Sequence, residues 1–175
     1  MVGSLGFEKS FAVSSRGRSG GLGIFWNESI KLEILGYSEY HIDVLVKEVV
    51  PVQTMITFVY GEAQVAERYK TWDLLKSLVS ASSLPWLCIG DFNEVLHNYE
   101  HVGAGQRRRS QIQGFRDAID ICALTDIGYN GKRWTFEKKT SGGGYCRVRL
   151  DRALANTEWL SIFPHATLHH ETGAA

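Results

Sequence analysis

The sequence predicts an α/β sandwich with four layers, in which two mainly antiparallel or mixed β-sheets pack together and helices flank them. Two observations carry this prediction. Short β-rich runs alternate with turn residues as far as Tyr60, and in two later segments apolar residues recur at the three- and four-residue steps of an amphipathic helix. The length of 175 residues suits one domain with its own hydrophobic core. We therefore expect a single domain over residues 1–175.

Four strands are expected before Gly61, at residues 22–26, 31–35, 41–46 and 55–60, because each run is rich in β-branched or aromatic residues. Polar and apolar residues alternate at the start of the third run, as in a half-buried antiparallel strand. The glycine-rich segment 14–23 lacks the Lys-Ser/Thr ending of a phosphate-binding loop, so we expect a hairpin turn there.

Two helices and an intervening strand are expected in the middle of the chain. The first helix ends near residue 82 and the second begins at Ser110, a plausible N-cap. Leu84-Pro85 separates the first helix from residues 86–90, an apolar run of the length of a buried strand. The apolar residues that define the helices are Val65, Tyr69, Trp72, Leu75 and Val79 in the first, and Ile112, Phe115, Ile119 and Cys122 in the second.

The remaining segments are expected to be a loop, strands and one helical turn. Residues 97–109 are polar and contain glycine, which predicts a long exposed loop. Further strands are expected at 133–137, 146–154 and 163–169, with a helical turn at 157–161.

Composition limits the classes of partner. The 19 basic and 19 acidic residues give a formal net charge of zero, so a site for a polyanion has to be local. No apolar run approaches the roughly 18 residues that span a bilayer. Three widely spaced cysteines argue against a disulfide framework and a zinc knuckle. We expect a monomer without a disulfide-linked partner, located in the nucleus or cytoplasm because the first residues do not form a secretory signal.

The segment Asp91-Phe92-Asn93 is the first candidate for chemistry. A carboxylate and a carboxamide two residues apart at the end of a buried strand can share one cleft, while Phe92 points into the core. Such a pair suits phosphodiester hydrolysis, because the carboxylate can orient an attacking water and the amide can donate to a phosphoryl oxygen. The same residue types are also ordinary in turns, and residue types alone leave that alternative open.

The surrounding residues add a resemblance. The run Pro-Trp-Leu-Cys-Ile-Gly-Asp-Phe-Asn-Glu at 85–94 closely resembles the endonuclease of plant LINE-type retrotransposons, a member of the endonuclease/exonuclease/phosphatase superfamily with the DNase I-like fold. Residues 17–22, 58–61 and 149–154 resemble its glycine-rich turn, its tyrosine strand and its late aspartate motif, in the same order. Four ordered matches make the resemblance specific.

The resemblance implies a role for each matching residue. Asp91 would handle the water nucleophile and weakly bind Mg²⁺ or Mn²⁺, and Asn93 would contact the scissile phosphate of DNA. Tyr60 would offer its hydroxyl to that phosphate or to the leaving group. Asp151 would hold a histidine imidazole; the alternative is that Asp151 pairs with a neighbouring arginine.

Two motifs of the family have no match in this sequence. The magnesium-binding glutamate lies upstream of the glycine-rich turn, where this chain has only Glu8 in a different context. The closing Ser-Asp-His motif is not present, and His169 or His170 would be its only substitutes. We therefore expect a domain that is incomplete at the N- and C-terminal edges, with weak or no nuclease activity. Alternatives are a non-catalytic nucleic-acid-binding remnant and a phosphatase for small substrates.

Two basic segments are candidates for nucleic-acid binding. Arg107, Arg108 and Arg109 can contact backbone phosphates, and Lys132 and Arg133 place cations beside Trp134, as in a groove that also stacks bases. The alternative for both segments is a solvated charged surface.

Overall fold

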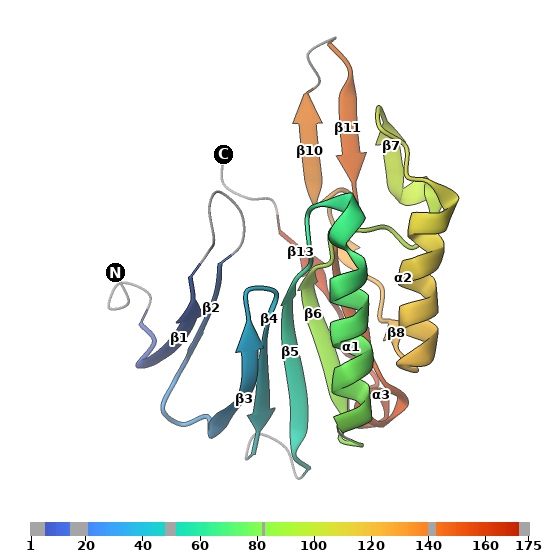
Figure 1. The fold of residues 1–175 in the computed structure, drawn as a ribbon. Coiled ribbons are helices and arrows are strands. Elements are labelled where there is room, and N and C mark those ends of the chain that lie inside the picture. Colours follow the sequence, from blue (N-terminus) through green and yellow to red (C-terminus); the bar gives the residue numbers. More distant parts are fainter. Residues whose placement is uncertain (1–5, 15–20, 48–51, 82, 140–142, 172–175) are drawn as a thin grey trace.

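The computed structural model of the chain describes residues 6–14, 21–47, 52–81, 83–139 and 143–171. A six-stranded mixed sheet forms its centre, as Figure 1 shows. The strands are, in spatial order, β3 (Leu32–Ser38), β4 (His41–Val46), β5 (Thr54–Tyr60), β6 (Trp86–Asp91), β12 (Asp151–Ala155) and β8 (Thr125–Asp126). All neighbours pair antiparallel except β5 and β6, which are parallel. A parallel pair needs a crossover connection, and α1 (Tyr69–Ala81) lies in it.

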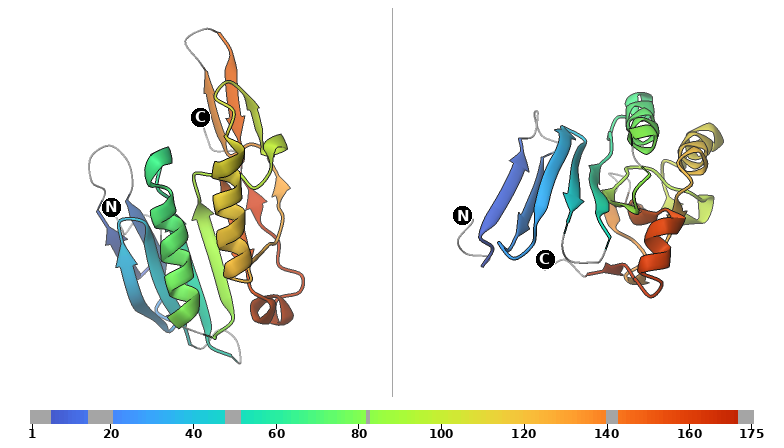
Figure 2. Two further views of the ribbon diagram at one scale, coloured as in Figure 1. Left: turned by 45° about the vertical axis from the view of Figure 1, so that its right-hand side comes forward. Right: turned by 90° about the horizontal axis from the view of Figure 1, so that it is seen from below.

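Two helices, α1 and α2 (Arg109–Ile121), lie side by side on one face of this sheet (Figure 2). Trp72 of α1 stacks on Phe115 of α2 with ring centroids 4.4 Å apart, and both side chains are buried against the sheet. The apolar stripe expected for the second helix is confirmed, because its four residues are all buried. The helix begins at Arg109, with Arg108 rather than Ser110 at the N-cap.

The expected first helix is only partly correct. Residues Val65–Glu67 form a separate 3-10 turn, η2, and the α-helix begins at Tyr69. Val65 and Tyr69 are exposed, whereas Trp72 and Leu75 are buried. The apolar spacing therefore crosses from a turn into a helix, and only its second half faces the core.

A two-stranded hairpin packs on the other face of the sheet. It consists of β1 (Lys9–Val13), which the sequence patterns do not predict, and β2 (Leu22–Trp26), which they place correctly. Alternate residues of β5 belong to the cluster beneath the helices and to the cluster around Ile24, so the hairpin and the helices cover opposite faces. The expected turn at 14–23 lies largely outside the described residues. The predicted α/β fold class, with mixed and antiparallel sheets and helices, is confirmed.

A smaller sheet projects from one end of the molecule (Figure 1). Its order is β10 (Phe136–Lys139), β11 (Tyr145–Val148) and β7 (His101–Gly103). The single strand expected at 146–154 is wrong, because β11 and β12 belong to different sheets. The exposed loop expected at 97–109 is also wrong in part, since η3 (Asn98–Glu100) and β7 lie within it and both Glu100 and His101 are buried.

The last described segment contains a helix and a short strand that lies outside the central sheet. Helix α3 (Thr157–Ile162) matches the expected helical turn. The strand expected at 163–169 is largely wrong, because only β13 (His169–His170) pairs, in parallel with β9 (Asn130–Gly131). No helix among the described residues has the length and apolar character needed to cross a lipid bilayer.

Candidate active site

Three of the predicted site residues lie in one row across adjacent strands. Tyr60 ends β5 and lies in register with Asp91, which ends β6. Asp151 begins β12 and is the antiparallel partner of Asp91. The strand order therefore brings together residues that are far apart in the sequence, and it puts Tyr60 and Asp151 on either side of Asp91.

The turn after Asp91 holds Asn93 in a constrained conformation. The Asn93 backbone N–H donates to Asp91 Oδ1 at 2.7 Å, and its side-chain amide donates to the Gly61 carbonyl at 2.7 Å. Asn93 has a φ of 55°, in the left-handed region that asparagine tolerates better than most residues. A Cβ at Gly61 would lie 2.6 Å from the Phe92 carbonyl oxygen, so only glycine allows this approach. Phe92 is fully buried, as its alternation with Asp91 predicted.

The Asp91 side chain is a weaker acid than an ordinary aspartate. Burial raises its pKa to about 6, and the negative charge of Asp151 acts in the same direction. The hydrogen bond from the Asn93 N–H and the charge of Arg68 partly oppose this increase. A carboxylate with a pKa near neutrality is a stronger base than an ordinary aspartate and is still largely ionised at pH 7.

A buried ion cluster lies behind the Asp91–Asn93 turn, and we call Arg68, Glu94 and Arg107 the Glu94 cluster. Arg68 donates from Nη1 to Glu94 Oε2 at 2.5 Å, and Arg107 Nε lies 3.2 Å from Glu94 Oε1 without hydrogen-bond geometry. Glu94 is fully buried. The cluster ties the residue after Asn93 to the segment before α1 and to the segment before α2.

A second buried cluster lies next to Asp151, and we call Glu100, Asp126, Arg149 and Arg152 the Glu100 cluster. Arg149 and Arg152 each form ion pairs with both carboxylates. The arginines that neighbour Asp151 in the sequence therefore pair with distant acids and not with Asp151. This finding removes the alternative that Asp151 serves as the partner of a neighbouring arginine.

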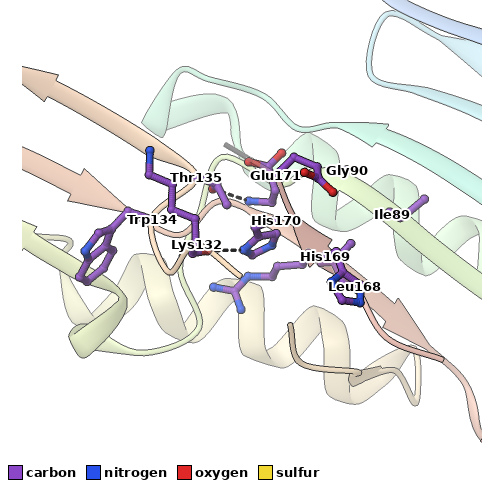
Figure 3. Close-up of a pocket in the computed structure, with 11 residues that line it drawn as sticks. Ile89, Gly90, Lys132, Trp134, Thr135, Leu168, His169, His170 and Glu171 are labelled. Atoms are coloured by element: carbon purple, nitrogen blue, oxygen red, sulfur yellow. Dashed lines mark hydrogen bonds between the residues drawn. The ribbon is translucent and has the colours of Figure 1, made fainter. Parts of the chain in front are cut away.

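A pocket of about 400 Å³ opens beside this row, and Asp151 and Gly90 contribute to its wall. Figure 3 shows Lys132 and Trp134 on one side of the pocket and His170 between them and Gly90. The Nδ1–H of His170 donates to the Lys132 carbonyl at 2.8 Å, and the buried Nε2 has no hydrogen-bond partner among the described residues. His169 also lines the pocket. Whether either histidine replaces the one expected from the family stays a prediction.

The predicted nucleic-acid-binding residues fall into different environments. Arg107 is engaged with Glu94, whereas Arg108 and Arg109 are exposed at the start of α2. Arg133 donates to the Tyr99 carbonyl at 2.8 Å, and its guanidinium carbon lies 4.5 Å from the centre of the Trp134 ring.

The metal expected from the resemblance has a limited set of ligands. Asp91 and Asp151 supply two neighbouring carboxylates, and no group of three or more His, Cys, Asp or Glu residues suited to a metal occurs in the described part of the chain. Mg²⁺ is commonly held by one or two carboxylates together with water and substrate phosphates. The residues present therefore fit a weak site that substrate completes.

Local sequence patterns do not reveal the residues that support the row. Thr135 Oγ1 accepts hydrogen bonds from the backbone N–H groups of Leu150 at 2.9 Å and Asp151 at 3.1 Å. Glu100 and Asp126 carry no local signal because their partners are distant in the sequence, and Glu94 stands out only as the last residue of the motif at 85–94. One sequence signal could have indicated the Glu100 cluster: Arg149 and Arg152 flank Asp151 with no second acidic residue beside them, so at least one arginine needs a distant partner.

Comparisons with known proteins bear on the family and the fold of the chain. A model of the endonuclease/exonuclease/phosphatase family matches residues 3–171. No curated protein is detectably similar in sequence. Among solved structures, the endonuclease domain of TRAS1, a telomere-specific non-LTR retrotransposon, has a TM-score of 0.60 and 9% identity, with 89% of this chain and 70% of that chain covered.

Two further structures share the fold at low identity. ANGEL2, a 2',3'-cyclic phosphatase, has a TM-score of 0.51 and 13% identity, with 90% of this chain and 64% of that chain covered. A humanized D. rerio TDP2 has a TM-score of 0.52 and 12% identity, with 87% of this chain and 62% of that chain covered. The chain thus spans less than two thirds of both proteins. Because the family model extends over nearly all of its residues, the chain belongs to the endonuclease/exonuclease/phosphatase family.

Proposed function

We propose that this chain is part of a metal-dependent DNA endonuclease domain of retrotransposon origin, and that the 175 residues alone cleave phosphodiesters weakly or not at all. The observation that carries the proposal is the row of Tyr60, Asp91 and Asp151 at the ends of three adjacent strands. The likeness to the TRAS1 endonuclease domain favours DNA over a small phosphoester as substrate. The resemblance of residues 85–94 to the plant LINE-type endonuclease favours the same choice.

The chemistry of the row suits attack by water on a phosphodiester. Asp91, at the end of β6, accepts a proton from the attacking water. The second N–H of the Asn93 amide donates to a phosphoryl oxygen, while the first stays bonded to the Gly61 carbonyl. Tyr60 donates its hydroxyl to the phosphate or to the leaving oxygen. Asp151 orients a histidine imidazole next to the phosphate, and His169 and His170 are the candidates for that histidine.

A divalent cation, Mg²⁺ or Mn²⁺, would be held by Asp91, with Asp151 nearby, and would offset the negative charge of the phosphate. Two carboxylates form an incomplete site, so low metal affinity is the reason for the expected low activity. The Lys132–Trp134 segment would hold the DNA backbone beside the pocket, and Arg108 and Arg109 would contact phosphates further away.

Nicking of supercoiled plasmid by the purified chain in Mn²⁺ tests the proposal. We expect slow nicking that falls about 100-fold or more in Asp91→Asn, since a general base contributes at least that factor. Asp73→Asn, in an exposed ion pair on α1, is the matched control and should leave the rate unchanged.

Each other outcome has a defined meaning. Nicking that survives Asp91→Asn contradicts the assignment of Asp91, and fast multiple-turnover nicking contradicts the expected low activity. Phosphate release from phosphomonoesters without nicking would identify a small-substrate phosphatase instead. Salt-dependent DNA binding that is lost when Arg108 and Arg109 are replaced by alanine, with no cleavage in Mn²⁺, would favour a non-catalytic binding remnant.

A further inference from the structure

The Glu100 cluster has a closed geometry that ordinary surface ion pairs lack. Arg149 reaches Glu100 Oε1 at 2.9 Å and Asp126 Oδ1 at 3.0 Å. Arg152 reaches Glu100 Oε2 at 2.5 Å and Asp126 Oδ2 at 2.7 Å. Each guanidinium therefore bridges both carboxylates, and every carboxylate oxygen has a charged partner. An arginine makes such a bridge with the two separate nitrogens of its fork, and the single nitrogen of a lysine cannot occupy both positions.

All four side chains of this cluster are largely removed from solvent. The exposed fraction is 0% for Arg152, 3% for Glu100, 7% for Arg149 and 18% for Asp126. Burial alone would raise the pKa of Glu100, but Arg152 and the backbone N–H groups of Leu96 and His97 hold it below the usual value. Burial also opposes ionisation of Asp126, and Arg149 holds its pKa below the usual value. Both acids are therefore charged at neutral pH.

The cluster is not explained by stability. Desolvation of buried ions costs about as much as their attraction returns, so an apolar replacement of similar volume is often neutral or stabilising. Two acids and two bases also cancel, so the cluster exerts little net field on the neighbouring carboxylates. The remaining explanation is a geometric role, because a ring of directional hydrogen bonds fixes the relative positions of the segments that carry the four side chains.

Bonds from this cluster reach the backbone of Arg149, and Thr135 binds the next two backbone N–H groups, those of Leu150 and Asp151. The Arg149 N–H donates to the Glu100 carbonyl at 3.0 Å, and Arg152 Nη2 donates to the Arg149 carbonyl at 3.3 Å. Thr135 Oγ1 accepts from Asp151 N–H at 3.1 Å. Asp151 is the first residue of β12, and the residues just before it connect β12 to β11 of the other sheet. Strand pairing therefore holds the chain after Asp151, but not the connection before it.

We propose that Glu100 and Asp126 are positioning residues for phosphodiester cleavage, acting through Arg149 and Arg152 to hold the Asp151 carboxylate opposite Asp91. This inference rests on the proposed function. It adds four residues to the site without placing any of them in contact with substrate. Glu100 is central, because it binds both arginines and also the backbone of Leu96 and His97.

The test replaces one matched pair by apolar residues, in the double variant Glu100→Leu/Arg152→Met. Asp126 and Arg149 still pair in this variant, while the N–H groups of Leu96 and His97 lose their acceptor, so its urea midpoint should fall moderately with the folded state retained. We expect the single-turnover nicking rate at saturating DNA to fall at least about tenfold, as misplacement by a fraction of an ångström does, with unchanged DNA affinity. Glu67→Gln, in an exposed ion pair with Lys70, is the control that should change neither quantity.

A second measurement separates this inference from the proposed function. Amide hydrogen exchange at Leu150 and Asp151 reports how firmly the start of β12 is held, whether or not the chain nicks DNA. We expect exchange at these two amides to be at least about tenfold faster in the double variant, while Leu87 to Ile89 of β6 stay unchanged. Unchanged nicking in the folded double variant overturns the proposal. Unchanged exchange at Leu150 and Asp151 also overturns it, including in the case that the wild type does not nick.

If the double variant does not fold, Arg149→Lys replaces it. Lysine keeps the charge but not the fork, so its single nitrogen cannot reproduce the bonds that Nη1 and Nη2 make to the two carboxylates. We expect slower nicking and faster exchange at Leu150 and Asp151, with the folded state retained. Wild-type values of both quantities in Arg149→Lys would overturn the proposal.

Discussion

The Glu94 cluster and the Glu100 cluster are built from the same residue types, yet they differ in charge. The Glu94 cluster has two guanidiniums around one carboxylate, which leaves an excess positive charge behind the Asp91 turn. The Glu100 cluster has two guanidiniums and two carboxylates and is balanced. Arg68 of the first cluster lowers the pKa of Asp91, in opposition to burial, whereas the second cluster contributes geometry. Similar buried ion pairs can therefore act on a site by electrostatic field or by position.

The largest expected effect comes from breaking the Glu94 cluster. Glu94→Gln leaves two arginines without a negative partner at a fully buried position, so we expect the free energy of unfolding to fall by about 3–5 kcal/mol. Urea denaturation measures this decrease. Glu67→Gln, at the surface, should change stability by no more than about 0.5 kcal/mol. A decrease as small as that of the surface control would show that the Glu94 cluster is not a coupled unit.

The next effect is a gain of stability in Asp91→Asn. The folded pKa of Asp91 is about 6, above the ordinary value of 3.8, so its favourable contribution is present below pH 4 and is lost as pH rises through 6. Above pH 6 the variant should be more stable than the wild type by about 2–3 kcal/mol, and below pH 4 the two should be equal. Thermal unfolding in EDTA across this range measures the difference. Equal stability at every pH would contradict the raised pKa.

A smaller effect is expected on the pH dependence of nicking. Arg68→Met removes the positive charge that opposes burial, so the acid limb of the rate profile should move to higher pH, by about one pH unit or less. Arg68→Lys keeps the charge and should leave the limb near its original position. The Glu100→Leu/Arg152→Met variant, which changes no net charge, should lower the rate without moving the limb. A shift in that variant instead would remove the distinction between the two clusters.

The smallest effects are expected at the exposed arginines. A plot of the logarithm of DNA affinity against the logarithm of salt concentration should become less steep in Arg108→Ala and in Arg109→Ala. The slope should decrease by about 0.9 for every phosphate that the arginine neutralises, with stability unchanged. Arg107→Ala should instead destabilise the fold, because Arg107 lies against buried Glu94. Fluorescence titration of duplex DNA at several salt concentrations measures the slopes. An unchanged slope in both exposed variants would remove the α2 start from the DNA-binding surface.

Local patterns predict much of the fold and fail at particular places. The α2 stripe is correct because helical spacing reports which side of a helix faces the core. The strand at 41–46 also forms, but it is not half-buried as its alternation predicts, because the polar side chains of His41 and Asp43 are buried too. The run 146–154 has the pattern of one strand although it changes sheets at Arg149-Leu150, and β-propensity carries no information about which sheet a strand joins. The polarity of residues 97–109 predicts a solvated loop, whereas Glu100 is buried by two arginines that follow about fifty positions later.

The sequence by itself determined that Asp91 and Asn93 are candidate site residues, because they follow a buried strand, and its resemblance to a known family added Tyr60 and Asp151. Only the tertiary structure decided that Tyr60 and Asp151 flank Asp91, since that depends on strand order and register. It also decided that Arg107 pairs with Glu94, and that the arginines beside Asp151 pair with Glu100 and Asp126. The attraction between charges depends on their distance in space. The fold therefore compensates the desolvation of a buried charge with any opposite charge that it brings within a few ångströms, however distant the two residues are in the sequence.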